Sequence, residues 1–318
     1  MRVASLLASG TEIVAALGAE ENLIGISHEC DYPESIMHLP RLTRARVNYL
    51  APSDLIHLEV QTLMLTALSL YEVHAEQLEA LKPDVIITQE QCNVCAVSLD
   101  DVKRIVAQLL KQQVEIVSLN PTSLDEIFQD IFRVANALKR QKQAETLVQS
   151  LKARIAAISE RCKDLPEKPR TLFVEWLDPI FTGGNWMPEL IELANGVSLL
   201  SEPKSRSVVY PIQDVLNAQP DVIIIAPCGF KLEQTRKDLH LLTQKPEWRA
   251  LKAVAEGRVF LADGNAYFNR SGPRIVESLE MLAAMMHPTH FADTLARYQA
   301  TGLIEPLMPE IASASLRQ

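Results

Sequence analysis

The stretch that decides the fold is Leu81-Lys82-Pro83-Asp84-Val85-Ile86-Ile87, because Ala218-Gln219-Pro220-Asp221-Val222-Ile223-Ile224 repeats its pattern later in the chain. In both copies a Pro-Asp pair leads into an unbroken apolar run, which is typical of a strand buried on both faces of a parallel sheet. Further strand-like runs occupy matching places around the two copies: Arg2–Leu7 and Arg170–Trp176, then Glu115–Leu119 and Gly257–Ala262. The repeat predicts two similar α/β units.

A long helical pattern separates the two copies. Apolar residues recur at helical spacing from Ser123 to about Asp164, and no proline or glycine interrupts them. Ser123 is a suitable N-cap, and the pattern is longer than an ordinary globular helix. We expect one long helix that joins the two lobes; two helices broken near residues 139–143 are the alternative. The predicted division is an N-terminal α/β lobe over 1–122, a connecting helix over 123–165, and a C-terminal α/β lobe with a loose tail over 166–318.

Length and composition exclude several classes of protein. The chain has 318 residues, 47% of them apolar and 22% charged, which suits a folded protein of about two domains. A formal net charge of -9 argues against nucleic-acid binding, which needs a basic face. No window approaches the ~20 apolar residues of a membrane span. The opening residues resemble a first strand more than a signal peptide. We therefore expect a cytoplasmic protein, and a periplasmic one only if the true start of the chain lies elsewhere.

Four of the five cysteines follow predicted strand ends, where open α/β sheets place ligands. Cys92 and Cys95 form a C-x-x-C motif, which suits zinc, an iron–sulfur cluster or dithiol chemistry. Cys30 and Cys228 would have to complete a four-thiolate site from other loops. The alternative is that these are small, partly buried residues without a ligand. Cys162, near the end of the connector, is predicted to be structural.

Polar and aromatic residues in the same predicted loops are candidate ligand contacts. The segment from His28 to Pro33 is dense in imidazole, carboxylate and thiol groups, which suit either a metal or a large cofactor. Its alternative is a surface loop that caps its own backbone. Indole rings beside glycine and proline suit a flat, largely apolar ligand, although core packing is common for tryptophan. The candidate cofactor-binding residues are His28, Glu29, Asp31, Glu90, Glu175, Trp176, Trp186, Phe230, Tyr267, Asn269 and Arg270.

Common catalytic and nucleotide-binding motifs are absent from the sequence. There is no Walker A loop, no G-x-G-x-x-G, no H-E-x-x-H and no G-x-S-x-G. Binding without catalysis is therefore favoured over an enzyme, and no residue is assigned a catalytic role.

The chain resembles the class III substrate-binding proteins of ABC importers, also called the helical-backbone metal receptor superfamily. The resemblance rests on the repeated Pro-Asp-Val-Ile-Ile strands, the connecting helix and the opening from Ser5 to Gly18. Five segments are similar to a cobalamin-binding-like subgroup: His28–Pro33, Cys92–Ser98, Glu175–Pro179, Pro227–Phe230 and Tyr267–Arg274.

This resemblance implies two Rossmann-like lobes joined by a stiff helix, with a ligand cleft between the lobes. It implies a binding protein for a corrinoid such as cobalamin, or for another metal chelate, oriented by residues such as His28, Glu90 and Asn269. His28 would additionally be able to ligate cobalt. An ABC permease would be a partner if the protein is exported, and a two-lobed monomer needs no further partner.

Two other hypotheses stay open. Cys30, Cys92, Cys95 and Cys228 would ligate zinc or a [4Fe-4S] cluster in an intracellular metalloprotein or metal-dependent enzyme. The remaining hypothesis is a scaffold or sensor protein that keeps the cleft without a ligand, since a fold alone does not settle function.

Overall fold

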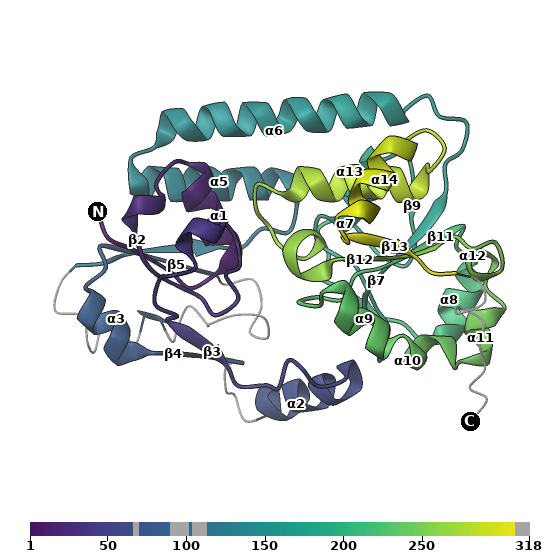
Figure 1. Cartoon of the computed structure of the whole chain (residues 1–318), viewed down its shortest axis with the longest axis horizontal. Coiled ribbons are helices and arrows are strands. Elements are labelled where there is room, and N and C mark those ends of the chain that lie inside the picture. The colour runs from purple at the N-terminus through teal and green to yellow at the C-terminus, as the bar shows by residue number, and fades with distance from the viewer. Residues whose placement is uncertain (66–69, 90–101, 104–112, 309–318) are drawn as a thin grey trace. The chain divides into compact units, whose positions relative to one another are not determined.

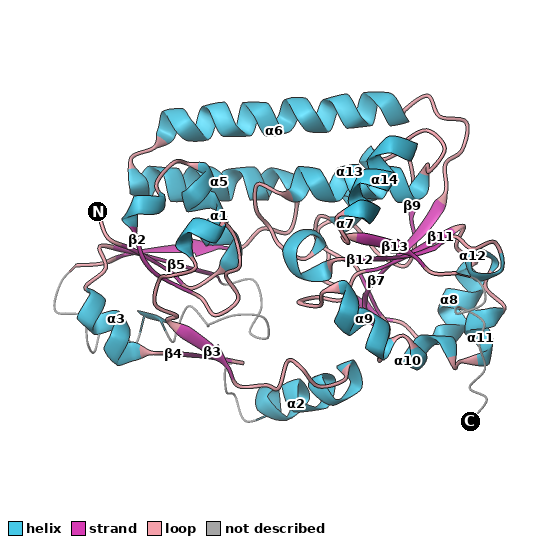
Figure 2. Ribbon diagram, viewed as in Figure 1, coloured by secondary structure: helices cyan, strands magenta, loops and turns pink. Residues whose placement is uncertain are grey.

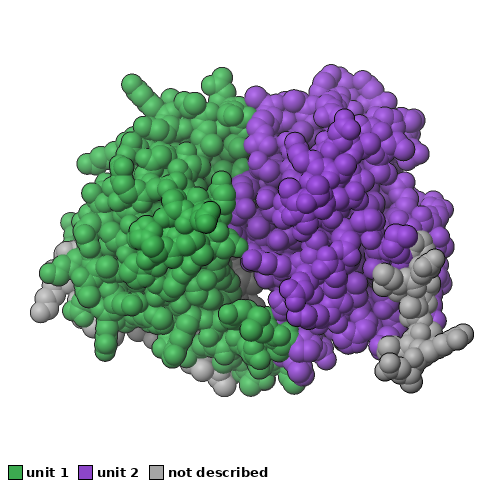
Figure 3. All heavy atoms as spheres, viewed as in Figure 1, with its two compact units in different colours: residues 1–51, 58–151, 271–273 green, residues 52–57, 152–270, 274–318 purple. Residues whose placement is uncertain are grey.

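The computed structural model describes residues 1–65, 70–89, 102–103 and 113–308. The chain divides into two compact units, coloured separately in Figure 3. Unit 1 comprises Met1–Ala51, Leu58–Leu151 and Ser271–Pro273, and unit 2 comprises Pro52–His57, Lys152–Arg270 and Arg274–Gln318. Each unit contains its own largely parallel sheet, so the predicted α/β organisation in two lobes is confirmed.

Unit 1 is built on a four-stranded sheet in the order β2-β1-β5-β6, with every neighbouring pair parallel. Its strands are β1 (Val3–Ser5), β2 (Leu23–Ile26), β5 (Val85–Gln89) and β6 (Glu115–Leu119). All five residues of β5 are buried, as its apolar run predicts. A separate antiparallel pair is formed by β3 (Thr43–Ala45) and β4 (Tyr71–Val73).

Helices lie on both faces of the unit 1 sheet, as Figure 1 shows. Leu78 of α3 packs with Ala4 and Ile86 on one face, and α1 and α5 lie on the other. The helices that begin in unit 1 are α1 (Ala8–Ala16), α3 (Ala75–Leu81), α5 (Leu124–Leu138) and α6 (Gln141–Cys162), with short 3-10 turns η1 (Glu20–Asn22) and η2 (Glu34–Ile36). Helix α2 (Ser53–Leu65) begins in unit 2 and continues in unit 1.

Unit 2 has a larger sheet in the order β10-β8-β7-β11-β12-β13, with β9 also paired to β7. Its inner strands β9, β7, β11 and β12 are parallel, whereas β8, β10 and β13 are antiparallel additions. The bounds are β7 (Arg170–Trp176), β8 (Phe181–Thr182), β9 (Val197–Ser198), β10 (Val208–Val209), β11 (Val222–Ile225), β12 (Val259–Ala262) and β13 (Ile304–Pro306).

Helices cover both faces of the unit 2 sheet as well (Figure 2). Ile223 and Ile225 of β11 pack in a core with Trp248, which α11 supplies, and α13 lies on the opposite face. The helices are α7 (Met187–Leu193), α8 (Ile212–Ala218), α9 (Leu232–Asp238), α10 (His240–Thr243), α11 (Pro246–Arg249), α12 (Lys252–Ala255), α13 (Ile275–Met286) and α14 (Ala292–Ala300), with one π-helical turn, η3 (Gly264–Phe268).

The two units share one topology, which confirms the internal repeat. The order β2-β1-β5-β6 in unit 1 corresponds to β9-β7-β11-β12 in unit 2. The likeness extends to single atoms. The guanidinium of Arg2 donates to the carbonyl oxygen of Leu81, and the guanidinium of Arg170 donates to that of Ala218, at 2.9 and 2.8 Å. The repeated Pro-Asp sequence therefore corresponds to the same local structure in both units.

The connecting helix differs from the expectation of a single element over 123–165. Ser123 does cap a helix, because its side chain accepts a hydrogen bond from the Glu126 N–H. That helix, α5, ends at Leu138, where Lys139 adopts a left-handed conformation with φ of 56°. A second helix, α6, then runs from unit 1 into unit 2. The predicted single helix is therefore wrong in its extent, and the alternative break near residues 139–143 is the one observed.

Within the described residues, no helix has the length and apolar character needed to cross a bilayer.

Candidate functional site

Strand order locates the candidate site within each unit. In unit 1 the chain moves from β1 outward to β2 and later returns to the other side of β1 with β5. Unit 2 repeats this reversal around β7 and β11. Ligands of open α/β sheets bind outside the carboxyl ends of the strands near such a reversal. The loops that follow these strands therefore form the candidate site of each unit.

In unit 1 the loop after β2 is organised around His28. The half-buried imidazole places Nδ1 2.7 Å from the Thr43 hydroxyl oxygen, and the His28 backbone N–H donates to the same oxygen at 3.0 Å. Burial lowers the pKa of His28 to about 4, and the positive charge of Arg41 and then His74 act in the same direction. The side chain is therefore a neutral imidazole at physiological pH.

Two residues outside the predicted set hold this loop. The Arg41 guanidinium donates to the carbonyl oxygens of Ser27 at 2.9 Å and Cys30 at 2.6 Å. Tyr71, on β4, donates its hydroxyl to Glu29 at 2.7 Å, and its ring centroid lies 4.9 Å from that of His28. Both come from the antiparallel β3–β4 region, whose contact with the β2 loop leaves no local pattern in the sequence.

The cysteines predicted to bind a metal are only partly described. Cys92, Cys95 and the neighbouring Glu90 lie outside the described residues. Cys30 is 2% exposed, and its sulfur lies 3.2 Å from the Thr11 hydroxyl. Cys228 is half-buried in unit 2. In the described part of the chain, no three His, Cys, Asp or Glu side chains gather as a metal site. The four-thiolate zinc or iron–sulfur site therefore stays a prediction.

In unit 2 the ends of β7 and β11 bring two aromatic rings together. Trp176 is the last residue of β7, and Phe230 follows β11; their ring centroids are 5.1 Å apart at an interplanar angle of 58°. The half-buried Trp176 donates its indole N–H to the Ser53 carbonyl oxygen at 3.2 Å. Because that bond satisfies its only polar group, the exposed part of the ring is an apolar surface.

Neighbouring polar residues fix the loops around this pair. Glu175 accepts a 2.7 Å hydrogen bond from the Ser207 hydroxyl, and its carbonyl oxygen accepts the Cys228 N–H at 3.0 Å. The Asn269 amide donates to the carbonyl oxygens of Ala226 at 2.9 Å and Gly264 at 3.1 Å. Asn269 therefore braces the end of β11 against η3, and only its carbonyl oxygen is left to meet a ligand.

The other predicted contacts occupy varied environments. Arg274 lies over the Tyr267 ring, 4.9 Å from its centroid, and burial raises the pKa of Tyr267. Arg270 is buried and donates to Asn265 at 3.4 Å. Trp186 is 6% exposed and its N–H donates to the Phe268 carbonyl oxygen at 3.0 Å, which places it in the interior of unit 2. Asp31 is half-buried in the loop after β2.

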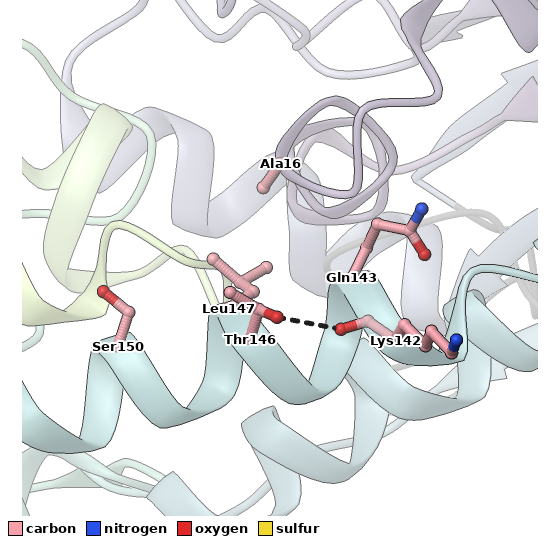
Figure 4. Close-up of a pocket in the computed structure, with 6 residues that line it drawn as sticks. All are labelled: Ala16, Lys142, Gln143, Thr146, Leu147 and Ser150. Atoms are coloured by element: carbon pink, nitrogen blue, oxygen red, sulfur yellow. Dashed lines mark hydrogen bonds between the residues drawn. The ribbon is translucent and has the colours of Figure 1, made fainter.

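Surface hollows in the described part of unit 1 include two that lie away from these loops. The larger, of about 520 Å³, lies between Ala16 at the end of α1 and the first turns of α6, where Thr146 donates to the Lys142 carbonyl oxygen (Figure 4). The smaller, of about 440 Å³, lies between Arg46, Asn48 and the second half of α2. Neither is lined by a residue from the loops that follow the parallel strands, so neither is the predicted ligand site.

Comparisons with known proteins place the chain in context. A family model described as "Periplasmic binding protein" matches residues 3–266. An uncharacterized ABC transporter substrate-binding lipoprotein of Bacillus subtilis is 24% identical, and the match covers 92% of this chain and 82% of the relative. The vitamin B12-binding protein of Yersinia pestis is 22% identical, with 92% and 89% covered. The crystal structure of a periplasmic haem-binding protein from Pseudomonas aeruginosa superposes with a TM-score of 0.67 at 20% identity, covering 91% and 93%. This last likeness concerns the fold alone.

These comparisons overturn the predicted cytoplasmic location. The matching family is described as one of periplasmic binding proteins, and the Bacillus subtilis relative is named as a lipoprotein. They point to a location outside the cytoplasmic membrane. The expectation rested on opening residues that form β1 and the start of α1, so those residues describe the fold and not the compartment.

Proposed function

The chain belongs to the periplasmic binding protein family, and from this premise we propose that it binds a corrinoid or a similar metal tetrapyrrole without transforming it. We propose further that it passes this ligand to the permease of an ABC transporter. The name of the Bacillus subtilis relative, a substrate-binding lipoprotein of an ABC transporter, supports the second step.

The observation that carries the proposal is an aromatic pair beside the carboxyl ends of the strands in each unit. Unit 1 has His28 with Tyr71, and unit 2 has Trp176 with Phe230. Phe230 is buried and supports Trp176 from behind, so Trp176 is the ring of this pair that can meet a ligand. His28 and Tyr71 are both half-buried. Partly exposed rings of this kind suit a flat, largely apolar ligand. Small polar solutes such as sugars or amino acids would instead call for a dense set of hydrogen-bonding groups.

Polar groups next to these rings suit the edge of a tetrapyrrole. Corrinoids carry amide groups around the ring, and haem carries two carboxylates. The Asn269 carbonyl oxygen would accept from an amide, and the Arg274 guanidinium would pair with a carboxylate. The names of the relatives agree with this chemical class, since one is called a vitamin B12-binding protein and one solved structure a haem-binding protein.

A ligand panel tests the proposal. The purified protein is titrated separately with cyanocobalamin, diaquocobinamide, ferric haem and a ferric hydroxamate siderophore, and its melting temperature is recorded. A ligand that binds only the native state raises the melting temperature. At a concentration 100 times its dissociation constant, it increases the free energy of unfolding by about 2.7 kcal/mol. We expect stabilisation by at least one of the three tetrapyrroles.

Substitutions connect any stabilisation to the proposed residues. Trp176→Ala is expected to weaken tetrapyrrole binding about tenfold or more, equivalent to at least ~1.4 kcal/mol. Trp176→Phe, which keeps an aromatic ring, is the matched control and should retain most of the affinity. Stabilisation by the siderophore alone would contradict the tetrapyrrole assignment, and the absence of stabilisation by all four compounds would contradict chelate binding altogether.

A further inference from the structure

A hydrogen-bond network on the β2 loop defines which nitrogen of His28 carries the proton. The Thr43 hydroxyl donates to the Ser27 hydroxyl oxygen at 3.1 Å. Thr43 has a single hydroxyl hydrogen, so this bond uses its only donor. The Thr43 oxygen then acts as an acceptor toward His28, both for the backbone N–H at 3.0 Å and for Nδ1 at 2.7 Å. Nδ1 therefore carries the hydrogen.

The same network leaves Nε2 of His28 with a lone pair. In a neutral imidazole one nitrogen is protonated and the other is an acceptor. No described residue donates a hydrogen bond to Nε2. Thr43 and Ser27 are buried, and the two ring nitrogens point in divergent directions, so Nε2 points away from this pair. An imidazole whose Nδ1–H is held by a protein oxygen while Nε2 stays unprotonated is the arrangement that metal-ligating histidines adopt.

The surroundings keep the ring in this form and orientation. Tyr71 packs against the imidazole, and the Tyr71 hydroxyl is itself held by Glu29. Arg41 clamps the loop backbone on both sides of His28 through the carbonyl oxygens of Ser27 and Cys30. The ring is thus fixed by a hydrogen bond, a ring contact and a braced loop.

We propose that His28 Nε2 coordinates the metal of the bound chelate directly, as an axial ligand. This inference rests on the proposed function and deepens it, because it selects among metal tetrapyrroles. A ligand whose metal has an exchangeable axial position, such as diaquocobinamide or ferric haem, is bound by coordination. Cyanocobalamin, whose two axial positions are occupied by cyanide and by its own base, is not. Coordination exchanges a bound water for the imidazole nitrogen and changes no oxidation state.

Absorption spectra of defined complexes test the proposal. The wild-type protein and His28→Ala are each mixed with diaquocobinamide and with ferric haem, and binding is followed independently by quenching of tryptophan fluorescence. We expect the wild-type complex to show the spectrum of a nitrogen-ligated metal. His28→Ala should bind about 10- to 100-fold more weakly and keep the spectrum of a water-ligated metal. Free imidazole added to the His28→Ala complex should restore the nitrogen-ligated spectrum.

A second variant examines the role of Thr43 in positioning the ring. Thr43→Val keeps the shape of the side chain but removes the acceptor for Nδ1–H. We expect about tenfold weaker binding with the nitrogen-ligated spectrum retained, since Nε2 still coordinates but the ring is less well held. Cyanocobalamin should bind wild-type protein and His28→Ala equally, if it binds either.

The outcomes separate this inference from the proposed function. If both the wild type and His28→Ala quench fluorescence with the same affinity and give the same spectrum, axial ligation by His28 is wrong and tetrapyrrole binding stands. If diaquocobinamide, ferric haem and cyanocobalamin all leave the tryptophan fluorescence of the wild-type protein unquenched and their own absorption spectra unchanged, the proposed function fails. Axial ligation then fails with it.

Discussion

The carboxylate of Asp84 accepts a hydrogen bond from the backbone N–H of Arg2 at 2.8 Å. In return, the Asp84 backbone N–H donates to the Arg2 carbonyl oxygen, also at 2.8 Å. These contacts fasten the amino end of β1 to the residue that precedes β5. Asp221 and Arg170 make the equivalent pair in unit 2, with a 2.9 Å bond from the Arg170 N–H to the Asp221 carboxylate. The aspartate of each Pro-Asp segment therefore sets the register of its parallel strands.

Removing this carboxylate should destabilise the sheet by a predictable amount. Asp84→Ala deletes a hydrogen bond to a charged acceptor near the surface, so we expect the free energy of unfolding to fall by about 1 kcal/mol. Urea denaturation followed by circular dichroism measures the change. Asp84→Asn keeps an oxygen acceptor at the same place and should lose about half as much. An unchanged free energy of unfolding in Asp84→Ala would show that the hydrogen bond to Arg2 does not contribute.

The strands and the repeat could be predicted because their signals are local. A buried parallel strand needs consecutive apolar residues, and β5 and β11 both show them. The break between α5 and α6 could not be predicted in the same way. Lys139 ends α5 in a left-handed conformation that the sequence does not mark with glycine or asparagine. The hydrophobic pattern continues through the break, because each of the two helices has its own buried face.

Site residues were predictable only as far as position along the chain determines them. Strand ends identify the loops, and therefore Trp176 and His28 as candidates. The same reasoning cannot separate Trp176 from the buried Trp186, since both lie near glycine and proline. Nor does it identify Tyr71 and Arg41, which reach the β2 loop from elements distant in the sequence. Such partners are determined by tertiary packing.

Asp130 should make the stability of the protein depend on pH. Burial raises the pKa of this α5 carboxyl from 3.8 to about 6, against the opposing charge of Arg133. Between pH 4 and 6 the folded state therefore binds more protons than the unfolded state, so this group makes stability fall as pH rises through that window. A shift of about two units corresponds to at most ~3 kcal/mol.

Asp130→Asn tests this linkage. The variant cannot ionise, so its free energy of unfolding should lack the decrease that Asp130 causes between pH 4 and 6. Subtracting the unfolding free energies of variant and wild type at each pH cancels the contribution of all other titrating groups. A difference that stays constant from pH 4 to 7 would contradict the raised pKa of Asp130.

Cys162 should resist thiol reagents in the native protein. Its side chain is fully buried at the end of α6, and burial raises the pKa of the thiol to about 11. Both factors suppress the thiolate, which is the reactive form. Alkylation with iodoacetamide at pH 8, mapped by mass spectrometry, should modify the half-buried Cys228 well before Cys162. In urea, where both thiols are exposed, the two should react at similar rates. Equal rates in the native protein would contradict this expectation.

Gly264 should be intolerant of any side chain, because two segments of the unit 2 site touch at its α-carbon. A β-carbon at this position would lie 2.1 Å from the Pro227 carbonyl oxygen and 2.6 Å from that of Ala226. Both obstacles are backbone atoms, so the loop after β11 would have to move away from η3. We expect Gly264→Ala to cost about 2 kcal/mol or more in stability and to weaken tetrapyrrole binding, since Phe230 and Asn269 are held by the same segments.

Gly272→Ala is the matched control for this substitution. A β-carbon there would meet its nearest neighbour, a Glu12 carboxylate oxygen, at 3.4 Å, which is ordinary van der Waals contact. Its melting temperature should lie within a few degrees of the wild type, whereas that of Gly264→Ala should fall by several degrees. If Gly264→Ala melts like Gly272→Ala, the loop after β11 yields readily, and the close packing of β11 against η3 does not hold Phe230 in place. If Gly264→Ala is destabilised but binds tetrapyrroles with unchanged affinity, the aromatic pair of unit 2 does not depend on this contact.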